Sequence, residues 1–233
     1  MGEPAEDESL TESLAVAETN AKRSRLLMAV LLSLSLFFPA IALGAANPSP
    51  RVLVLGDSLS AAYNMPTESG WVALLRERLG DDARVINAAI SGDTTAGARA
   101  RLGQALDTHQ PNLVIIALGG NDGLRGIALE AFRANLNAMI TAARQAGANV
   151  VLAGVRLPAN YGSAFIERFL GIYAQVADAR DVAFVPRLLQ GVATNPDLMQ
   201  ADGIHPNAKA QPIILDNLWP VLAPLLNHPR AAG

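Results

Sequence analysis

The sequence predicts an α/β domain in which helices cover both faces of a parallel sheet. Short apolar runs alternate along the chain with longer segments of helical periodicity, and that order is typical of βαβ units. The chain has 233 residues, of which 51% are hydrophobic and 17% charged, which is enough apolar material for the core of one domain. No internal repeat or low-complexity linker divides residues 47–233, so we expect them to form that single domain.

Five short segments are expected to be strands. The clearest is Leu113–Leu118, which is apolar throughout, as in a strand buried on both faces of a parallel sheet. The helices that connect such strands pack with a right-handed crossover. The other four segments are Arg51–Leu55, Arg84–Asn87, Val150–Val155 and Val182–Val185.

Five longer segments are expected to be helices. The most regular is Glu130–Gln145, which carries one apolar stripe at helical spacing and is followed by a capping glycine, Gly147. The stripe consists of Phe132, Leu136, Met139, Ile140 and Ala143. The other helical segments are Ser69–Leu79, Thr94–Asp107, Ser163–Ala177 and, despite Pro212 and Pro220, Asn207–Leu226.

The residues that precede the predicted domain have a different character. Residues 1–25 form an acidic and then basic extension that we expect to be disordered. Residues 26–46 are apolar and end in small residues, which is typical of a secretory signal peptide. The extension before this segment is unusually long, and two explanations fit: translation starts further downstream, or the segment remains as a membrane anchor of roughly 20 residues. We expect a periplasmic or secreted protein, with an exported domain anchored in the inner membrane as the alternative.

Charge and composition exclude several classes of protein. The net charge of -3 comes from residues 1–46, so the predicted domain is neutral and lacks the basic excess of a nucleic-acid binder. The chain has no cysteine, which excludes disulfides, thiolate nucleophiles and cysteine–zinc sites, and its three histidines argue against a histidine-rich metal site. We therefore expect no metal, no cofactor and no nucleic acid, and the neutral domain favours a monomer.

Polar and glycine residues follow the predicted strands at the edge where parallel sheets bind ligands. Ser58 follows a Gly-Asp turn after the first strand, Gly92 follows the second, and Asn121 lies in Gly-Gly-Asn-Asp after the third. Asp202 and His205 stand just before the last helix. Each residue taken alone is ordinary in a turn, a helix cap or a hydrogen-bonded structural position.

Taken together, these residues meet the chemical requirements of a serine hydrolase. A serine hydroxyl needs a base to become a nucleophile, and a neutral histidine supplies one. A carboxylate must orient that histidine, and hydrogen-bond donors must face the oxyanion that forms during attack. The sequence contains a candidate for each part.

Four sequence blocks resemble the SGNH (GDSL) hydrolase family and occur in the family's order. They are GDSLS at 56–60, Gly92 within SGD, GGND at 119–122 and DGIHP at 202–206. Longer stretches resemble the periplasmic multifunctional acyl-CoA thioesterase I / arylesterase / lysophospholipase subgroup. These stretches are GDSLSAAYNM at 56–65, GGNDGLRG at 119–126 and RLPANYG at 156–162.

The resemblance implies a three-layer α/β/α, flavodoxin-like fold with a five-stranded parallel sheet. It also implies an exported serine esterase that hydrolyses small acyl esters and thioesters through an acyl-enzyme. In this family Ser58 would be the nucleophile, His205 the base and then the acid, and Asp202 the orienting carboxylate. The oxyanion hole would consist of the N–H groups of Ser58 and Gly92 and the side-chain amide of Asn121.

The segment 156–162 is expected to be a loop after the fourth strand. In the resembling subgroup it borders the acyl groove and moves on ligand binding, so Leu157, Pro158 and Tyr161 are candidate substrate-binding residues; ordinary loop packing is the alternative. Two other functions stay open at this stage. One is a carbohydrate O-acetylesterase of the same fold, and the other is a non-catalytic module that binds a lipid or nucleotide through its glycine loops.

Overall fold

The structure, a computed structural model, describes residues 49–227. The predicted extension at residues 1–25 and the predicted signal or anchor segment at residues 26–46 lie outside the described residues. Within the described part, no helix combines the length and the apolar character that crossing a membrane requires.

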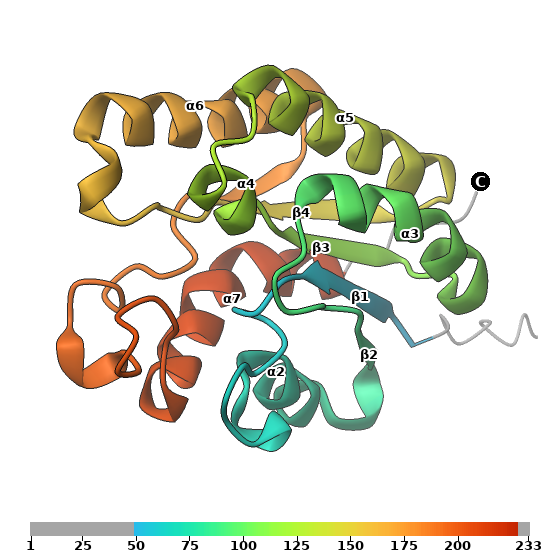
Figure 1. The fold of residues 1–233 in the computed structure, drawn as a ribbon. Coiled ribbons are helices and arrows are strands. Elements are labelled where there is room, and N and C mark those ends of the chain that lie inside the picture. The colour runs from blue at the N-terminus through green and yellow to red at the C-terminus, as the bar shows by residue number, and fades with distance from the viewer. Residues whose placement is uncertain (1–48, 228–233) are drawn as a thin grey trace, which may run out of the picture. The chain divides into compact units, whose positions relative to one another are not determined.

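Five parallel strands form one sheet in the order β2-β1-β3-β4-β5 (Figure 1). The prediction of a five-stranded parallel sheet is confirmed, and each strand overlaps its predicted segment. The strands are β1 (Arg51–Gly56), β2 (Arg84–Asn87), β3 (Leu113–Ala117), β4 (Asn149–Ala153) and β5 (Ala183–Val185).

Helices cover both faces of the sheet, as predicted (Figure 1). Leu53 and Leu55 of β1 belong to one hydrophobic cluster and Val52 and Val54 to the other, because successive strand residues point to opposite faces. The first cluster packs against α3 (Thr95–His109), α5 (Leu129–Gln145) and α6 (Ser163–Arg180), and the second against α2 (Trp71–Leu79) and α7 (Gln211–Asn227).

The end of α5 confirms the predicted capping glycine. Gly147 lies one position beyond the C-cap with a φ of 81°. Its N–H donates to the carbonyl of Arg144, and the N–H of Ala148 donates to the carbonyl of Ala143, both at 3.0 Å. This pair of bonds satisfies carbonyls that the helix end would otherwise leave without a partner.

Two predicted helices begin later than the sequence pattern suggests. The first starts at Trp71, because Gly70 has an extended backbone with a ψ of 149°. The last starts at Gln211 and places Pro212 in its first turn, where a backbone N–H needs no partner within the helix. Short 3₁₀ turns lie at Thr67–Ser69, Gly80–Asp82, Ala159–Tyr161, Pro196–Leu198 and Ala208–Ala210.

A short helix that the sequence analysis does not predict, α4 (Gly120–Leu124), follows β3 through Gly119. Gly119 has a φ of 118°, and a side chain there would collide with the hydroxyl of Tyr173 and the ring of Phe132. Only glycine therefore permits this sharp turn into α4. Five residues are too few for a helical periodicity to be detected, although the turn carries Asn121 to the carboxyl edge of the sheet.

Candidate active site

Ser58 lies in the turn that directly follows β1. The Oδ1 atom of Asp57 accepts a hydrogen bond from the N–H of Leu59 at 3.0 Å, and the carbonyl of Asp57 accepts two further backbone bonds at 3.0 Å. The indole N–H of Trp71 donates to the carbonyl of Leu59 at 3.1 Å. These bonds fix the backbone on both sides of Ser58 and present its hydroxyl at the carboxyl edge of the sheet.

The structure brings Ser58, His205 and Asp202 together, although 147 positions separate the serine from the histidine. The Nε2 atom of His205 lies 2.9 Å from Oγ of Ser58, and its Nδ1 atom lies 2.7 Å from Oδ2 of Asp202. Both distances are within the range needed for proton transfer and for orientation of the ring. With Nδ1 protonated toward the carboxylate, Nε2 is free to accept the serine proton.

Asp202 is held in its charged form by its own loop. Its Oδ1 atom accepts the N–H groups of Ile204 and His205, both at 2.9 Å. Partial burial acts to raise the pKa of Asp202, but these bonds, the bond to the imidazole and the charge of His205 outweigh it and lower the pKa from 3.8 to about 2. Asp202 is therefore ionised at neutral pH and can stabilise a protonated imidazole.

Gln200 connects the loop of His205 to the turn of Ser58. Its N–H donates to the carbonyl of His205 at 2.7 Å, and its side-chain amide donates to the carbonyls of Tyr63 at 2.9 Å and Pro206 at 3.0 Å. Its Oε1 atom accepts the amide of Asn64 at 3.2 Å. Gln200 is not predictable from the sequence, because it lies outside every motif and the residues it bonds on the other loop are 136 and 137 positions away.

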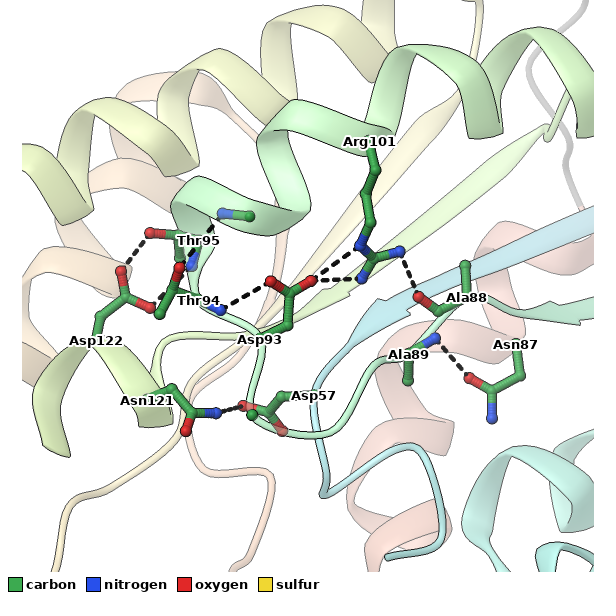
Figure 2. A network of polar contacts seen from close by, with 12 residues as sticks. Asp57, Asn87, Ala88, Ala89, Asp93, Thr94, Thr95, Arg101, Asn121 and Asp122 are labelled. Carbon is green, nitrogen blue, oxygen red and sulfur yellow. Dashed lines mark hydrogen bonds and ion pairs between the residues drawn. The ribbon is translucent and has the colours of Figure 1, made fainter. Parts of the chain in front are cut away.

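The predicted oxyanion hole consists of the N–H groups of Ser58 and Gly92 and the side-chain amide of Asn121, and their joint action on one oxygen stays a prediction. Within residues 49–227, the N–H groups of Ser58 and Gly92 donate to no other protein group, so both are available to a ligand. Asn121 is the second residue of α4, and its amide lies 3.5 Å from Oδ2 of Asp57 (Figure 2). The amide nitrogen carries two N–H groups, so one can lie toward Asp57 while the other donates to a substrate oxygen.

Asp57 precedes Ser58 in the Gly-Asp-Ser motif and has no predicted role. Its side chain is 1% exposed. Burial raises the pKa of Asp57 from 3.8 to about 6, although the N–H of Leu59, the charge of His205 and the amide of Asn121 act in the opposite direction. The aspartate is visible in the Gly-Asp-Ser motif, but its burial against Asn121 depends on packing across the fold.

Figure 2 shows how the loop between β2 and α3 is fixed. At one end, Asp93 forms an ion pair with Arg101 of α3, with 2.8 Å between Oδ2 and the guanidinium. Two residues further on, Thr95, the first residue of α3, donates its N–H to Oδ2 of Asp122 at 2.9 Å and its hydroxyl to Oδ1 of Asp122. The loop that carries Gly92 is thus anchored to both α3 and α4.

A cavity of about 570 Å³ opens beside Ser58. Leu157 and Pro158 line it, as expected for substrate-binding residues. Tyr161 is not among the lining residues; its hydroxyl donates to the carbonyl of Leu124 at 3.0 Å, and Leu124 lines the cavity. Contact of the first two residues with a substrate stays a prediction, and the position of Tyr161 favours an indirect effect through Leu124.

A second cavity, of about 390 Å³, lies between α5 and α6 and contains none of the predicted site residues. Among residues 49–227, no group of three or more histidine and acidic side chains could hold a metal ion. The absence of a metal or cofactor from the reaction stays a prediction.

Comparison with known proteins gives a consistent result. Residues 54–212 match the GDSL-like lipase/acylhydrolase family. The chain is 53% identical over 178 residues to the esterase TesA of Pseudomonas aeruginosa, covering 75% of this chain and 89% of that protein. It is 43% identical over 183 residues to thioesterase 1/protease 1/lysophospholipase L1 of Escherichia coli, covering 78% and 88%. The crystal structure of the psychrotrophic esterase EstA from Pseudoalteromonas sp., inhibited by monoethylphosphonate, is similar with a TM-score of 0.72 and 37% identity, covering 77% and 100%.

Proposed function

The chain belongs to the GDSL-like lipase/acylhydrolase family and is an ester hydrolase, and from this premise we propose that Ser58, His205 and Asp202 carry out its reaction. The observation that supports the proposal most strongly is the continuous row of contacts from Oγ of Ser58 through the imidazole to Oδ2 of Asp202, at 2.9 and 2.7 Å.

In the first half of the reaction, Oγ of Ser58 attacks the acyl carbonyl while Nε2 of His205 accepts the hydroxyl proton. The carbonyl oxygen becomes an oxyanion that accepts hydrogen bonds from the N–H groups of Ser58 and Gly92 and from the amide of Asn121. His205 then donates its proton to the leaving alcohol or thiol as the carbon–oxygen or carbon–sulfur bond breaks. The products of this half-reaction are the released alcohol or thiol and an acyl ester on Ser58.

In the second half of the reaction, water takes the place of the alcohol. His205 removes a proton from the water as its oxygen attacks the acyl-enzyme, and the same three donors stabilise the second oxyanion. Collapse of this intermediate returns the proton to Oγ of Ser58 and releases the carboxylic acid. Asp202, with its lowered pKa, stays ionised and stabilises the protonated imidazole in both halves.

The substrate class we propose is acyl esters and thioesters with an acyl chain longer than acetyl. The cavity beside Ser58 has a volume of about 570 Å³, and each methylene that it buries contributes about 0.8 kcal/mol. The names of the relatives, esterase and thioesterase 1/protease 1/lysophospholipase L1, agree with this class. The apolar wall of the cavity includes Leu124, Val155, Leu157, Leu189, Met199 and Ile204.

The decisive experiment measures hydrolysis of p-nitrophenyl butyrate by the Ser58→Ala variant. We expect the rate to fall by about 10⁴-fold or more while the thermal unfolding midpoint stays near that of the wild type. Ser163→Ala, at the exposed start of α6, is the matched control and should retain full activity. Covalent labelling by an organophosphonate should occur in the wild type and the control but not in Ser58→Ala. Retention of the wild-type rate by Ser58→Ala would refute the mechanism.

A series of p-nitrophenyl esters from acetyl to decanoyl tests the substrate class. We expect kcat/KM to rise with chain length up to the limit that the cavity accommodates. A maximum at acetyl would instead identify a carbohydrate O-acetylesterase type of specificity.

We further propose that the enzyme is exported as a monomer and acts in the periplasm or outside the cell, directed by residues 26–46. Expression of the full chain followed by N-terminal sequencing of the exported product tests this. A new N-terminus near residue 45 supports cleavage, whereas an intact N-terminus in the membrane fraction identifies an anchor.

A further inference from the structure

Two arginines, Arg156 and Arg187, line the cavity beside Ser58. They lie in the loops that follow β4 and β5, which are neighbours in the sheet, and both are exposed. Because the carboxyl ends of parallel strands meet at one edge, both arginines belong to the same side of the sheet as Ser58.

The backbones of the two loops are fixed against each other. The N–H of Gly154 donates to the carbonyl of Val185 at 2.8 Å, and its carbonyl accepts the N–H of Leu188 at 2.9 Å. A side chain at Gly154 would lie 2.6 Å from the carbonyl oxygen of Pro186, so glycine permits this close approach. These bonds extend the pairing of β4 and β5 beyond the strands, and therefore hold the two arginines in adjacent stretches of the cavity wall.

The charge of this wall is positive and uncompensated. Within the described part of the chain, one acidic residue, Asp57, lines this cavity. It is 1% exposed, and its carboxylate accepts hydrogen bonds from the N–H of Leu59 and the amide of Asn121. Neither Arg156 nor Arg187 forms an ion pair with any carboxylate in residues 49–227; the guanidinium of Arg187 donates only to Oε1 of Gln190, at 3.4 Å. A guanidinium stays charged at working pH and binds carboxylates and phosphates through paired N–H groups.

We propose that Arg156 and Arg187 form a subsite for an anionic group of the substrate, a carboxylate or a phosphate placed away from the scissile carbonyl. This inference rests on the proposed function, because it assigns a substrate class to the same site. Esters that carry such a group are preferred over neutral esters of equal length, because their charge meets the two guanidinium groups without displacing a carboxylate partner.

Two pairs of substrates distinguish the two sources of negative charge. For a charge on the acyl side, p-nitrophenyl pentanoate is compared with the p-nitrophenyl monoester of glutaric acid, which has the same number of acyl carbons. For a charge on the leaving group, the butyryl monoester of glycerol is compared with the butyryl ester of glycerol 3-phosphate. The variants are Arg156→Gln, Arg187→Gln and the double variant. The control is Arg168→Gln, which removes the same charge from α6 beside the other cavity.

In at least one pair, we expect the double variant to lower kcat/KM for the anionic ester by about threefold to tenfold, the range for two partly solvated ion pairs, while the neutral ester changes less than twofold. Arg168→Gln should leave the ratio of kcat/KM for the anionic ester to that for the neutral ester unchanged in both pairs. The pair that responds identifies the side on which the charge lies. Unchanged anionic-to-neutral ratios in both pairs would overturn the subsite, whereas absence of hydrolysis of every neutral ester would instead contradict the proposed function.

A second inference rests on a different set of contacts, those of α4 with the start of α3. Asp122 is 1% exposed and accepts both the N–H and the hydroxyl of Thr95 (Figure 2). The same hydroxyl accepts the side-chain amide of Asn135 from α5 at 3.1 Å. At the end of α4, the guanidinium of Arg125 donates to the carbonyl of Gly92 at 2.9 Å.

These contacts join the elements that carry two of the proposed oxyanion donors. Asn121 precedes Asp122 on α4, and Gly92 lies three residues before Thr95. We infer that Asp122 is a positioning residue that sets the spacing between the Asn121 amide and the Gly92 N–H. The inference rests on the proposed function, because the spacing affects rate only if both groups stabilise the oxyanion.

The variants Asp122→Asn and Arg125→Gln test this positioning role at its buried and its exposed contact. Asp107→Asn, on the exposed surface of α3, is the control. We expect kcat to fall about tenfold in Asp122→Asn and less in Arg125→Gln, with KM changed less than twofold, since loss of a complete oxyanion donor costs about 10²–10³-fold. Affinity for a boronic acid that mimics the tetrahedral intermediate should fall in parallel, while affinity for the carboxylic acid product is retained.

If Asp122 had only a structural role, Asp122→Asn would lower the unfolding temperature, but the affinity for the boronic acid would not fall relative to the affinity for the carboxylic acid product. Boronic acid affinity and kcat within twofold of the wild type in both folded variants would overturn the inference. If Ser58→Ala retained activity, the failure would lie with the proposed function instead.

Discussion

The two carboxylates of the candidate site, Asp202 and Asp57, lie in opposite environments. The Asp202 side chain is 38% exposed and its pKa is lowered to about 2, whereas Asp57 is 1% exposed and its pKa is raised to about 6. Asp202 accepts three bonds of 2.7–2.9 Å, while the Asp57 side chain accepts one at 3.0 Å and one at 3.5 Å. The two residues are of the same type, so exposure to solvent and short hydrogen bonds decide which carboxylate is stabilised in its ionised form.

The two carboxylates also differ in their effect on the stability of the fold. Asp202 is ionised and solvated, so it supports His205 at little cost to stability. Asp57 must be buried next to Asn121 to reach its amide, and burial of its charge destabilises the fold at neutral pH. We interpret Asp57 as a residue that orients Asn121 despite that cost.

The largest expected effect is the loss of activity on substitution of the exposed carboxylate, Asp202. Asp202→Asn removes the acceptor of the imidazole Nδ1 proton, so we expect kcat for p-nitrophenyl butyrate to fall by about 10²–10⁴-fold. The free energy of unfolding should change by less than about 1 kcal/mol, because the side chain is partly solvated. Activity within threefold of the wild type would show that His205 does not depend on this carboxylate.

The dependence of stability on pH should differ in sign between the two carboxylates. The raised pKa of Asp57 stabilises the fold below pH 3.8, and this contribution is lost as the pH rises through about 6. The lowered pKa of Asp202 stabilises the fold above pH 3.8, and this contribution is lost as the pH falls toward 2. Relative to the wild type, Asp57→Asn should therefore gain about 2 kcal/mol of unfolding free energy between pH 4 and pH 8. Urea unfolding at both pH values measures the gain, and a constant difference would contradict the raised pKa.

Asp57→Asn should be less active than the wild type at the pH at which it is more stable. Asparagine is a weaker acceptor for the amide of Asn121, so we expect kcat at pH 8 to fall about tenfold with KM nearly unchanged. Steady-state kinetics on p-nitrophenyl butyrate measures this, with Asp107→Asn as the control. A variant that is both more stable and fully active would mean that Asp57 does not orient Asn121.

The smallest expected effect concerns the link between the two loops. Gln200→Ala removes the side-chain bonds to Tyr63, Asn64 and Pro206, so the His205 loop becomes less well aligned with Ser58. We expect kcat to fall about threefold to fivefold, corresponding to roughly 1 kcal/mol of lost alignment. Gln175→Ala on α6 is the control, and an equal effect of the two substitutions would contradict a specific role for Gln200.

The secondary structure and the core were largely predictable from local pattern. All five residues of the stripe predicted for α5 are fully buried, and every residue of β3 is buried. The unpredicted helix α4 has five residues, and the late start of α2 comes from one extended glycine; both are too local for periodicity to detect. The candidate residues Ser58, Asp202 and His205 were likewise identifiable, because each stands in a short motif next to a strand or helix end.

The sequence by itself determined the order of strands and helices, the two faces of the sheet and the residue types offered at its carboxyl edge, because these follow from periodicity and turn chemistry over a few neighbouring residues. Only the tertiary structure decided the 2.9 Å contact between His205 and Ser58, the burial that raises the pKa of Asp57 and the pairing of Thr95 with Asp122. Each of these depends on segments that are distant in the chain and meet only when the sheet and its helices pack, and no local pattern encodes the distance or the solvent exposure that results.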